Sequence, residues 1–291
     1  MSSQFRFKLK ALLTRNKTMD MKSYTCNCLS DIRQKAPLVH NITNFVVMNS
    51  SANILLALGA SPVMAHARGE VEDMASLASA VVLNIGTLDD LWVESMILAG
   101  KSANRKGIPV VIDPVGAGAT RLRTEAARRI MSECQVDVIR GNASEVLSLW
   151  DAEVSTKGVE SSVSLSDHVA DSAVRIAKIN KLVVAISGVE DCITDGTNTY
   201  RVKNGHALMT KVTGLGCGLS AVTAAFCAVK PDELLQAATA AFGYYGLCGD
   251  IAGQAAGKPG SFFTEFLDAL YSAGEKEIMT SVRINRIGGP L

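Results

Sequence analysis

The residues in this sequence best suited to chemistry lie in one glycine-rich turn, Thr213-Gly214-Leu215-Gly216-Cys217-Gly218. Three glycines in five residues allow the backbone to adopt positive φ angles and to approach a ligand closely. Apolar residues then recur at helical spacing, at Leu219, Val222, Phe226 and Val229. The turn is therefore predicted to lead into a helix N-terminus, where unpaired amides and the helix dipole favour a phosphate or a developing anion.

Cys217 lies at the mouth of this predicted helix. At such a position the pKa of a thiol is expected to fall, and the side chain can meet the hydroxyl of a substrate. The alternative is a buried structural cysteine within a glycine-rich turn. This stretch of sequence alone leaves both interpretations open.

The rest of the chain alternates between short apolar runs and longer segments with helical periodicity, which predicts an α/β fold. Strands are expected over residues 38–42, 63–64, 80–85, 109–113, 137–140 and 182–188. Helices are expected over residues 45–58, 89–104 and 124–134, from residue 142, and over 169–179, 219–229, 231–252 and 262–272. A hairpin is expected around Asp195-Gly196 and a surface loop over residues 151–167. The sequence thus predicts a three-layer αβα sandwich with a mainly parallel sheet and no second domain.

Polar residues at the predicted strand ends are candidates for a site, because ligands of such sheets collect beyond the carboxyl ends of the strands. Asp113 ends one strand, and the Pro114 that follows favours extended backbone geometry at Asp113. The carboxylate of Asp113 suits the binding of a hydrated Mg²⁺; the alternative is that Asp113 is only a turn residue. Arg140 ends the next strand, and Asn142 and Glu145 follow with the spacing of a helix capping box. An arginine and an acid in these places also suit nucleotide phosphates and Mg²⁺.

Four further residues belong to this edge or lie close to it. Ser187 ends another apolar strand and offers a hydroxyl to a nucleotide, or is only part of a turn. Asn44 caps the first predicted helix, and Met48 lies on the apolar stripe of that helix, either in the core or in the wall of a small-molecule pocket. His40, inside the first strand, is expected to be a buried imidazole rather than a ligand.

The composition excludes several classes of protein. A hydrophobic content of 48% with a formal charge of +1 indicates a soluble globular chain without the basic footprint of a nucleic-acid-binding protein. Seven cysteines without paired CxxC spacing predict neither a zinc site nor a disulfide framework, and hence a cytoplasmic protein. The charge-free runs 36–67 and 212–229 are broken by polar residues and glycines, so they are interpreted as buried segments rather than membrane spans. There is no G-x-x-x-x-G-K-[ST] loop, and the glycine-rich turn lacks the acidic partner of a dinucleotide site.

The first 19 residues carry five basic side chains and no acidic one. Their weakly amphipathic pattern is typical of an organelle transit peptide. The favoured alternative is an over-extended start, with Met19 or Met21 as the initiator. Residues 1–20 are expected to lie outside the fold, and residues 21–291 to form one domain.

Taken together, these motifs resemble those of the hydroxyethylthiazole kinases, from about residue 37 to residue 270. The resemblance rests on several segments in the same order: Leu38-Val39-His40-Asn41-Ile42-Thr43-Asn44, Leu56-Ala57-Leu58-Gly59-Ala60-Ser61-Pro62-Val63-Met64, Asn84-Ile85-Gly86-Thr87-Leu88, Asp113-Pro114-Val115, Arg140-Gly141-Asn142-Ala143-Ser144-Glu145, Met209-Thr210-Lys211-Val212-Thr213-Gly214 and Gly216-Cys217. Two departures stand out: Leu215 occupies a position where the family often has Ala or Thr, and residues 1–20 have no counterpart.

The resemblance implies a ribokinase-like fold without a separate lid domain. It also implies phosphorylation of 5-(2-hydroxyethyl)-4-methylthiazole by ATP and Mg²⁺ in thiamine salvage, by a homotrimer with active sites between subunits. The resemblance further implies that Met48, Gly214 and Asn44 bind the alcohol and that Arg140 and Ser187 bind ATP. Glu145 and Asp113 would form the magnesium environment, and Cys217 would be the catalytic residue. Related kinases have an aspartate base where Cys217 stands, so the cysteine either deprotonates the hydroxyl or only orients it. A kinase for another small alcohol, such as a hydroxymethylpyrimidine, and a non-catalytic binding protein are the alternatives.

Overall fold

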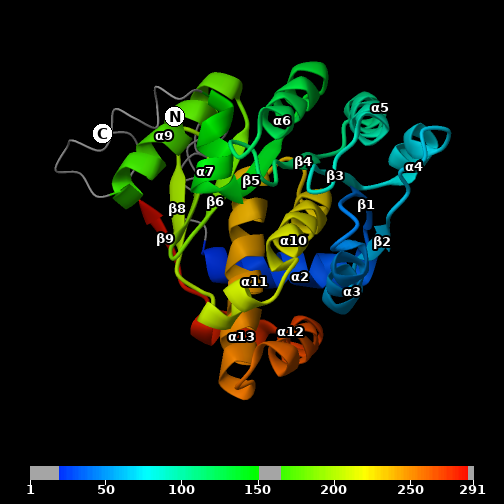
Figure 1. Cartoon of the computed structure of the whole chain (residues 1–291). Helices are drawn as coiled ribbons and strands as arrows, with labels where there is room; N and C mark the ends of the chain where they lie inside the picture. Colours follow the sequence, from blue (N-terminus) through cyan, green and yellow to red (C-terminus); the bar gives the residue numbers. More distant parts are fainter. Residues whose placement is uncertain (1–19, 151–164, 288–291) are drawn as a thin grey trace, which may run out of the picture.

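A computed structural model describes residues 20–150 and 165–287, and these residues form three layers around a single sheet (Figure 1). The sheet has nine strands in the order β2-β1-β3-β4-β5-β6-β7-β8-β9 within the described residues. The strands are β1 (Leu38–Ile42), β2 (Ser61–Val63), β3 (Ala80–Asn84), β4 (Val110–Asp113), β5 (Val138–Asn142), β6 (Val183–Ser187), β7 (Asp191–Thr194), β8 (Thr199–Val202) and β9 (Ile284–Ile287). All pairings from β2 to β6 are parallel, and those from β6 to β9 are antiparallel.

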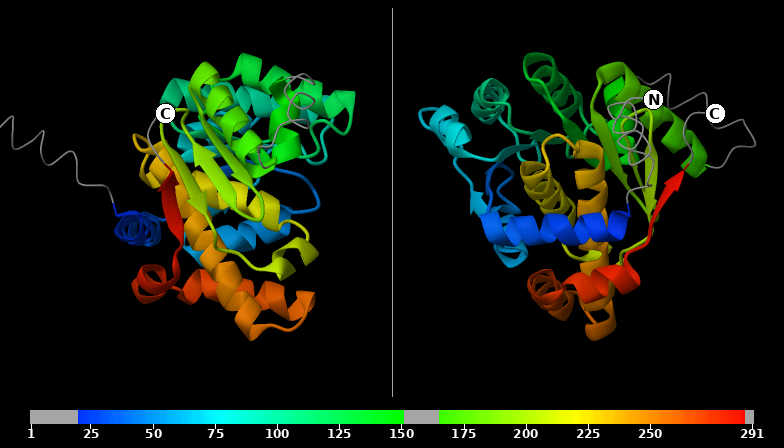
Figure 2. Two further views of the ribbon diagram at one scale, coloured as in Figure 1. Left: turned by 90° about the vertical axis from the view of Figure 1, so that its left-hand side faces the viewer. Right: turned by 180° about the vertical axis from the view of Figure 1, so that it is seen from behind.

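Helices cover both faces of the sheet (Figures 1 and 2). One face packs against α3 (Met48–Leu58), α10 (Leu215–Val229) and α11 (Leu234–Ala255). Three more helices pack on the outside of these: α2 (Met21–Lys35), α12 (Pro259–Ser272) and α13 (Glu275–Ser281). The other packs against α4 (Val71–Leu77), α5 (Asp90–Lys106), α6 (Arg121–Glu133), α7 (Ala143–Leu147) and α9 (Leu165–Asn180). Two short 3₁₀ helices, η1 (Ser148–Trp150) and η2 (Ala207–Lys211), complete the described elements. The predicted αβα sandwich with a mainly parallel sheet is confirmed.

The central strands are buried on both faces, which explains why the sequence shows them as continuous apolar runs. Every residue of β3 and β4 is buried, including the polar Asn84 and Asp113 at their ends. A strand between two helical layers has no solvent-facing side, so it lacks the alternation of an amphipathic strand. The polar residues that interrupt such runs need partners, and these partners form the site described below.

Several boundaries differ from the predictions. The first helix was expected from residue 45, but α3 begins at Met48, and Phe45 and Leu56 of the predicted apolar stripe are 62% and 59% exposed. The helix expected from residue 219 begins at Leu215, so Gly216, Cys217 and Gly218 form its first turn instead of a preceding loop. Gly214 is the N-cap, at φ 86°, a conformation that glycine adopts without steric cost.

The sequence did not predict the helix α2, which begins directly after the side-chain cap of Asp20. Four other short elements, α4, η2, α13 and β9, were also not predicted. The predicted surface loop at 151–167 lies mainly outside the described residues, and its last three residues belong to α9. Most of the predicted N-terminal extension also lies outside them, and the first described residue is Asp20. Among the described residues, no helix is long and apolar enough to cross a membrane.

Candidate active site

Five neighbouring parallel strands bring polar side chains to one edge of the sheet. Asn44 follows β1, Asn84 ends β3 and Asp113 ends β4. Arg140 lies in β5 and Ser187 ends β6. The register pairs Asn84 with Asp113 and Asn142 with Ser187, which aligns the carboxyl ends of the strands. The edge predicted from the sequence is therefore one continuous cluster of largely buried polar side chains.

Asp113 is the centre of a buried hydrogen-bond network. Its Oδ2 accepts hydrogen bonds from Asn84 Nδ2 at 2.8 Å and from Ser220 Oγ at 2.7 Å. The guanidinium of Arg140 lies 3.9 Å from the same oxygen. Burial raises the pKa of Asp113, and the positive charge of Arg140 opposes this rise. Asp113 thus connects β3, β4 and β5 to the first turns of α10.

Arg140 lies between this network and the β6 end. Its Nη2 donates a hydrogen bond to Ser187 Oγ at 2.7 Å. Its Nε is buried and has no hydrogen-bond partner among the described residues. A Cβ built on Gly216 would lie 3.2 Å from Arg140 Nη1, so the guanidinium stands directly beside the first turn of α10. An arginine next to a helix N-terminus is an arrangement that suits a phosphate group.

Cys217 faces the β1 end of the same edge and is only partly buried. Asn44 Nδ2 donates to its Sγ at 3.5 Å and to Asn84 Oδ1 at 2.9 Å. Burial raises the pKa of Cys217 to about 12, and the carboxylate of Asp113 contributes to this rise. The prediction that this pKa falls was wrong, because burial and a nearby negative charge outweigh the helix terminus.

Glu145 forms the predicted capping box with Asn142 and also reaches the loop after β4. Its Oε2 accepts the backbone N–H of Asn142, and its Oε1 accepts that of Gly116, both at 2.9 Å. Within the part of the chain that the structure describes, no group of three or more His, Cys, Asp or Glu side chains could hold a metal ion. Mg²⁺ sites of nucleotide enzymes commonly use only one or two carboxylates, and the substrate phosphates supply further ligands. Glu145 and Asp113 suit a site of this kind.

Met48 and Gly214 lie on two helix N-termini that meet at this edge. A Cβ on Gly214 would lie 2.9 Å from Val47 Cγ1 and 3.0 Å from Ser50 Oγ, so the glycine allows α10 to begin against the first turn of α3. Met48 begins α3, is half-buried and packs against the core on the α5 face of the sheet. His40 is buried as predicted, and its Nε2 hydrogen-bonds to Ala65 O at 2.7 Å.

The sequence pointed to the turn that begins at Asn84 as part of the site but assigned no role to Asn84, and it assigned none to Ser220. Asn84 is a polar residue that ends an apolar strand, which is the signal that identified Asp113. Ser220 lies one helical turn beyond Cys217, on a helix that was predicted to start only at residue 219. Tyr245 was also missed: its hydroxyl donates to Leu215 O at 2.8 Å and supports the first turn of α10 from within the core.

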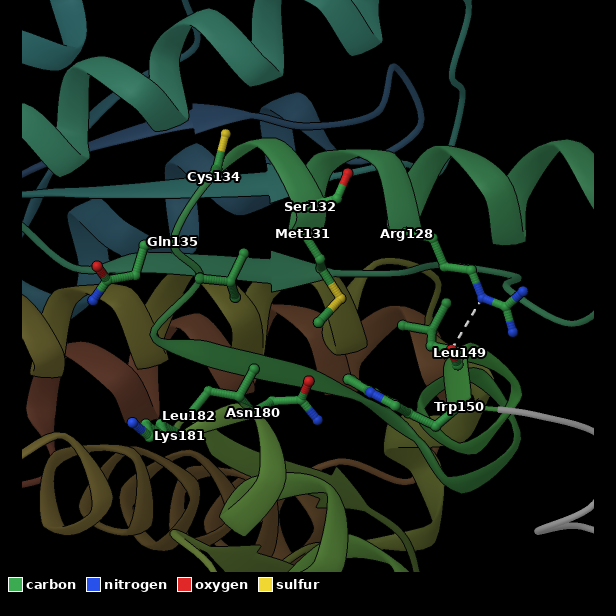
Figure 3. Close-up of a pocket in the computed structure, with 11 residues that line it drawn as sticks. Arg128, Met131, Ser132, Cys134, Gln135, Leu149, Trp150, Asn180, Lys181 and Leu182 are labelled. Carbon is green, nitrogen blue, oxygen red and sulfur yellow. Dashed lines mark hydrogen bonds between the residues drawn. The ribbon is translucent and has the colours of Figure 1, made fainter.

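A separate cavity of about 530 Å³ lies between α6, η1 and the amino ends of β5 and β6 (Figure 3). Met131, Leu149 and Trp150 form part of its wall, and Arg128 donates from its rim to Leu149 O. None of the predicted site residues lines this cavity. It lies at the opposite edge of the sheet from Asp113 and Cys217.

The layered fold is of ribokinase-like architecture. The structure of the pyridoxal kinase from Staphylococcus aureus in complex with AMP-PCP and pyridoxal superposes with a TM-score of 0.56 at 15% identity, covering 86% of this chain and 99% of that one. A ribokinase-like superfamily protein from Enterococcus faecalis superposes with a TM-score of 0.57 at 13% identity, covering 85% and 89%. At such identities the likeness concerns the fold.

Closer relatives identify the family. The profile of the hydroxyethylthiazole kinase family matches residues 29–276. A hydroxyethylthiazole kinase from Desulfotalea psychrophila is 52% identical over 256 residues, which are 88% of this chain and 93% of that protein. The structure of hydroxyethylthiazole kinase from Pyrococcus horikoshii superposes with a TM-score of 0.84 at 43% identity, covering 91% of this chain and 100% of that one. The chain belongs to the hydroxyethylthiazole kinase family.

Proposed function

We propose that this protein transfers the γ-phosphoryl group of ATP to the hydroxyl of 5-(2-hydroxyethyl)-4-methylthiazole, with Mg²⁺, in thiamine salvage. The observation that carries the proposal is the match to the hydroxyethylthiazole kinase family over residues 29–276. The polar edge supports it, because it joins a half-buried thiol and amide at the β1 end to an arginine at the β5 end. The thiol and amide suit an alcohol, and the arginine suits a phosphate chain, so both substrates can bind in one continuous site.

The thiazole alcohol binds between the N-termini of α3 and α10. Met48 provides an apolar contact for the ring, and Gly214 offers its backbone to the alcohol. Because Gly214 has no side chain, the start of α10 lies directly against Val47 and Ser50. Asn44 and Cys217, which are hydrogen-bonded to each other, direct the hydroxyl toward the start of α10. The substrate is thereby held with its hydroxyl oxygen, which receives the phosphoryl group, next to the amides at the start of α10.

The phosphate chain of ATP lies along Arg140, Ser187 and the first turn of α10. Arg140 has a buried Nε–H without a partner among the described residues, and a charged donor in this state has a strong preference for an anion. Ser187 orients the guanidinium through its Oγ. The amides of Gly216 and Cys217, in the first turn of α10, stabilise negative charge on the phosphoryl group as it moves, whereas the Gly218 N–H already donates to Gly214 O at 2.8 Å.

Glu145 and Asp113 would form the environment of Mg²⁺, which would supply positive charge to the phosphates when bound. Glu145 is the better direct ligand, because it is half-buried and each of its oxygens accepts only one backbone hydrogen bond. Oδ2 of Asp113 already accepts two hydrogen bonds and lies near Arg140, so this carboxylate acts chiefly by holding Arg140 and Ser220.

Cys217 orients the alcohol rather than removing its proton as a preformed thiolate. With a pKa of about 12, the thiol is protonated throughout the physiological range. A protonated thiol donates a weak hydrogen bond and accepts one from Asn44 Nδ2.

We further propose that residues 21–291 form one kinase domain that works in the cytoplasm as a homotrimer with active sites between subunits. Phe45, Val46 and Leu91 are more than 60% exposed, and Phe45 contacts Trp92 with ring centroids 4.9 Å apart. These apolar side chains lie beside the β1 and β3 ends, which supports a subunit contact there. The seven cysteines are all free, which suits a reducing compartment.

The test is ATP- and Mg²⁺-dependent phosphorylation of the thiazole alcohol by purified protein, with product detected by mass spectrometry. A competition assay with 4-amino-5-hydroxymethyl-2-methylpyrimidine addresses the alternative substrate. The proposal expects a thiazole phosphate and preference for the thiazole. ATP-dependent product from the pyrimidine alone would assign the protein to the other alcohol, and binding of either alcohol without ATP consumption would make it a non-catalytic binding protein.

A further inference from the structure

Arg123, in the first turn of α6, is bonded to the two loops that follow β3 and β4. Its Nη1 donates to Ile85 O at 3.1 Å and to Val115 O at 2.8 Å, and its Nη2 donates to Gly86 O at 2.8 Å. One guanidinium thus satisfies three backbone carbonyls from two neighbouring strand ends. A planar group with five donors is the side chain suited to such a bridge, and a lysine cannot reproduce its geometry.

The loop after β3 leads from Arg123 to the alcohol side of the site. Gly86 packs against Asn44 so closely that a Cβ on Gly86 would lie 2.5 Å from Asn44 Nδ2. The Gly86 N–H also donates to Asn84 Oδ1 at 3.0 Å, the oxygen that accepts from Asn44 Nδ2. Since Asn44 Nδ2 bonds to Cys217 Sγ, any shift of Gly86 moves the group that orients the thiol.

The loop after β4 leads from Arg123 to the phosphate side. Gly116 lies against the stem of Arg123: a Cβ on Gly116 would be 3.0 Å from Arg123 Cδ. The Gly116 N–H donates to Glu145 Oε1 at 2.9 Å. The arginine therefore fixes the loop that holds one oxygen of the proposed magnesium carboxylate.

We propose that Arg123 is a positioning residue that sets the distance between the alcohol side and the phosphate side of the active site by bridging the loops after β3 and β4. It contacts neither Cys217 nor Arg140 and acts through Gly86 and Gly116. The inference rests on the proposed function, because it concerns the alignment of the two groups that react there. Alignment of this kind contributes strongly to rate, and a displacement of about 1 Å can cost on the order of 100-fold.

The experiment compares Arg123→Lys and Arg123→Met with two matched controls. Arg121→Met removes a neighbouring arginine of α6 whose side chain, among the residues that the structure describes, pairs with Glu125 alone, on the surface. Arg33→Met removes a guanidinium that, like Arg123, donates to three backbone carbonyls, those of Leu270, Tyr271 and Ala273. The second control reports what the loss of such a bridge does to stability when the bridge does not involve the loops after β3 and β4.

The readouts are Tm, kcat and KM for each substrate, the affinity for Mg²⁺-ADP, and the rate at which iodoacetamide alkylates Cys217, resolved by peptide mass spectrometry. We expect Arg123→Met to lower kcat/KM by about 10- to 100-fold. It should also weaken Mg²⁺-ADP binding and change the alkylation rate of Cys217, with a smaller effect in Arg123→Lys. Arg33→Met should lower Tm without these changes, and Arg121→Met should behave as wild type.

The proposal is overturned if folded Arg123 variants keep the wild-type kinetics and alkylation rate, or change them no more than Arg33→Met does at an equal loss of Tm. If Arg123→Met does not fold, the same comparison is made with Arg123→Lys. Absence of thiazole phosphorylation by the wild-type protein refutes the proposed function instead. In that case the alkylation of Cys217 still decides whether Arg123 controls the packing around the thiol.

Discussion

Replacement of Cys217 by alanine separates the two roles that a thiol can have at this site. A thiol with a pKa of about 12 is ionised to only about 3 parts in 10⁵ at pH 7.5. If that thiolate were the obligatory base, the rate of the wild-type enzyme relative to the alanine variant would rise tenfold for each pH unit. If the thiol only orients the alcohol, the variant loses one weak hydrogen bond, worth about 0.5–1.5 kcal/mol, or roughly 2- to 13-fold.

We expect Cys217→Ala to lower kcat by this smaller factor, and the ratio of wild type to variant to stay constant between pH 7 and 9. The assay measures kcat at saturating ATP and thiazole alcohol, with the product quantified by chromatography in quenched samples. Cys227→Ala is the matched control, because Cys227 lies in the same helix but is fully buried in the core. A loss of 10²–10⁴-fold, the usual contribution of a general base, or a ratio that rises steeply with pH would refute the orienting role.

Two further predictions concern the loops around the site. In Gly86→Ala the new methyl group collides with Asn44, so we expect a loss of about 1–3 kcal/mol in the free energy of unfolding together with a fall in kcat/KM. Gly100→Ala, whose Cβ would lie 2.6 Å from Cys134 Sγ, should destabilise the fold and leave KM unchanged; equal kinetic effects of both variants would contradict the prediction. Asp191 has its pKa raised by burial from 3.8 to about 7, so its stabilising contribution is complete below pH 4 and is lost as the pH rises through 7. We expect the Tm advantage of Asp191→Asn over wild type to widen between pH 4 and 7 and to be constant above pH 8, and a pH-independent difference in thermal melts would disprove it.

The first strands illustrate how much local pattern reveals. The run at 38–42 was predicted with the bounds that β1 has, and Asp113 and Ser187 were placed at strand ends where the structure has them. These predictions succeed because a strand buried on both faces is a short, continuous apolar run, and the polar residue that ends it is conspicuous. Parallel strands then place such ends at a common edge without further information.

The start of α10 shows where local pattern misleads. Glycines at 214, 216 and 218 are typical of a turn, yet only Gly214 has a positive φ, and the other two lie inside the helix. They are explained by close neighbours that are distant in sequence: Arg140 beside Gly216, and Ile54 with the Tyr245 hydroxyl beside Gly218. A side chain at position 218 would collide with Ile54 and Tyr245, and one at position 216 would crowd Arg140.

The sequence by itself determined the layered α/β architecture, the family and the side chains at the strand ends. These features follow from the spacing of apolar and polar residues that are close together in the sequence. Only the tertiary structure decided their chemical state. The pKa of Cys217, the hydrogen bond from Ser220 to Asp113 and the bridge made by Arg123 depend on groups up to 173 residues apart. Charge, burial and hydrogen bonding act through distance in space, so these properties exist only once the chain is folded.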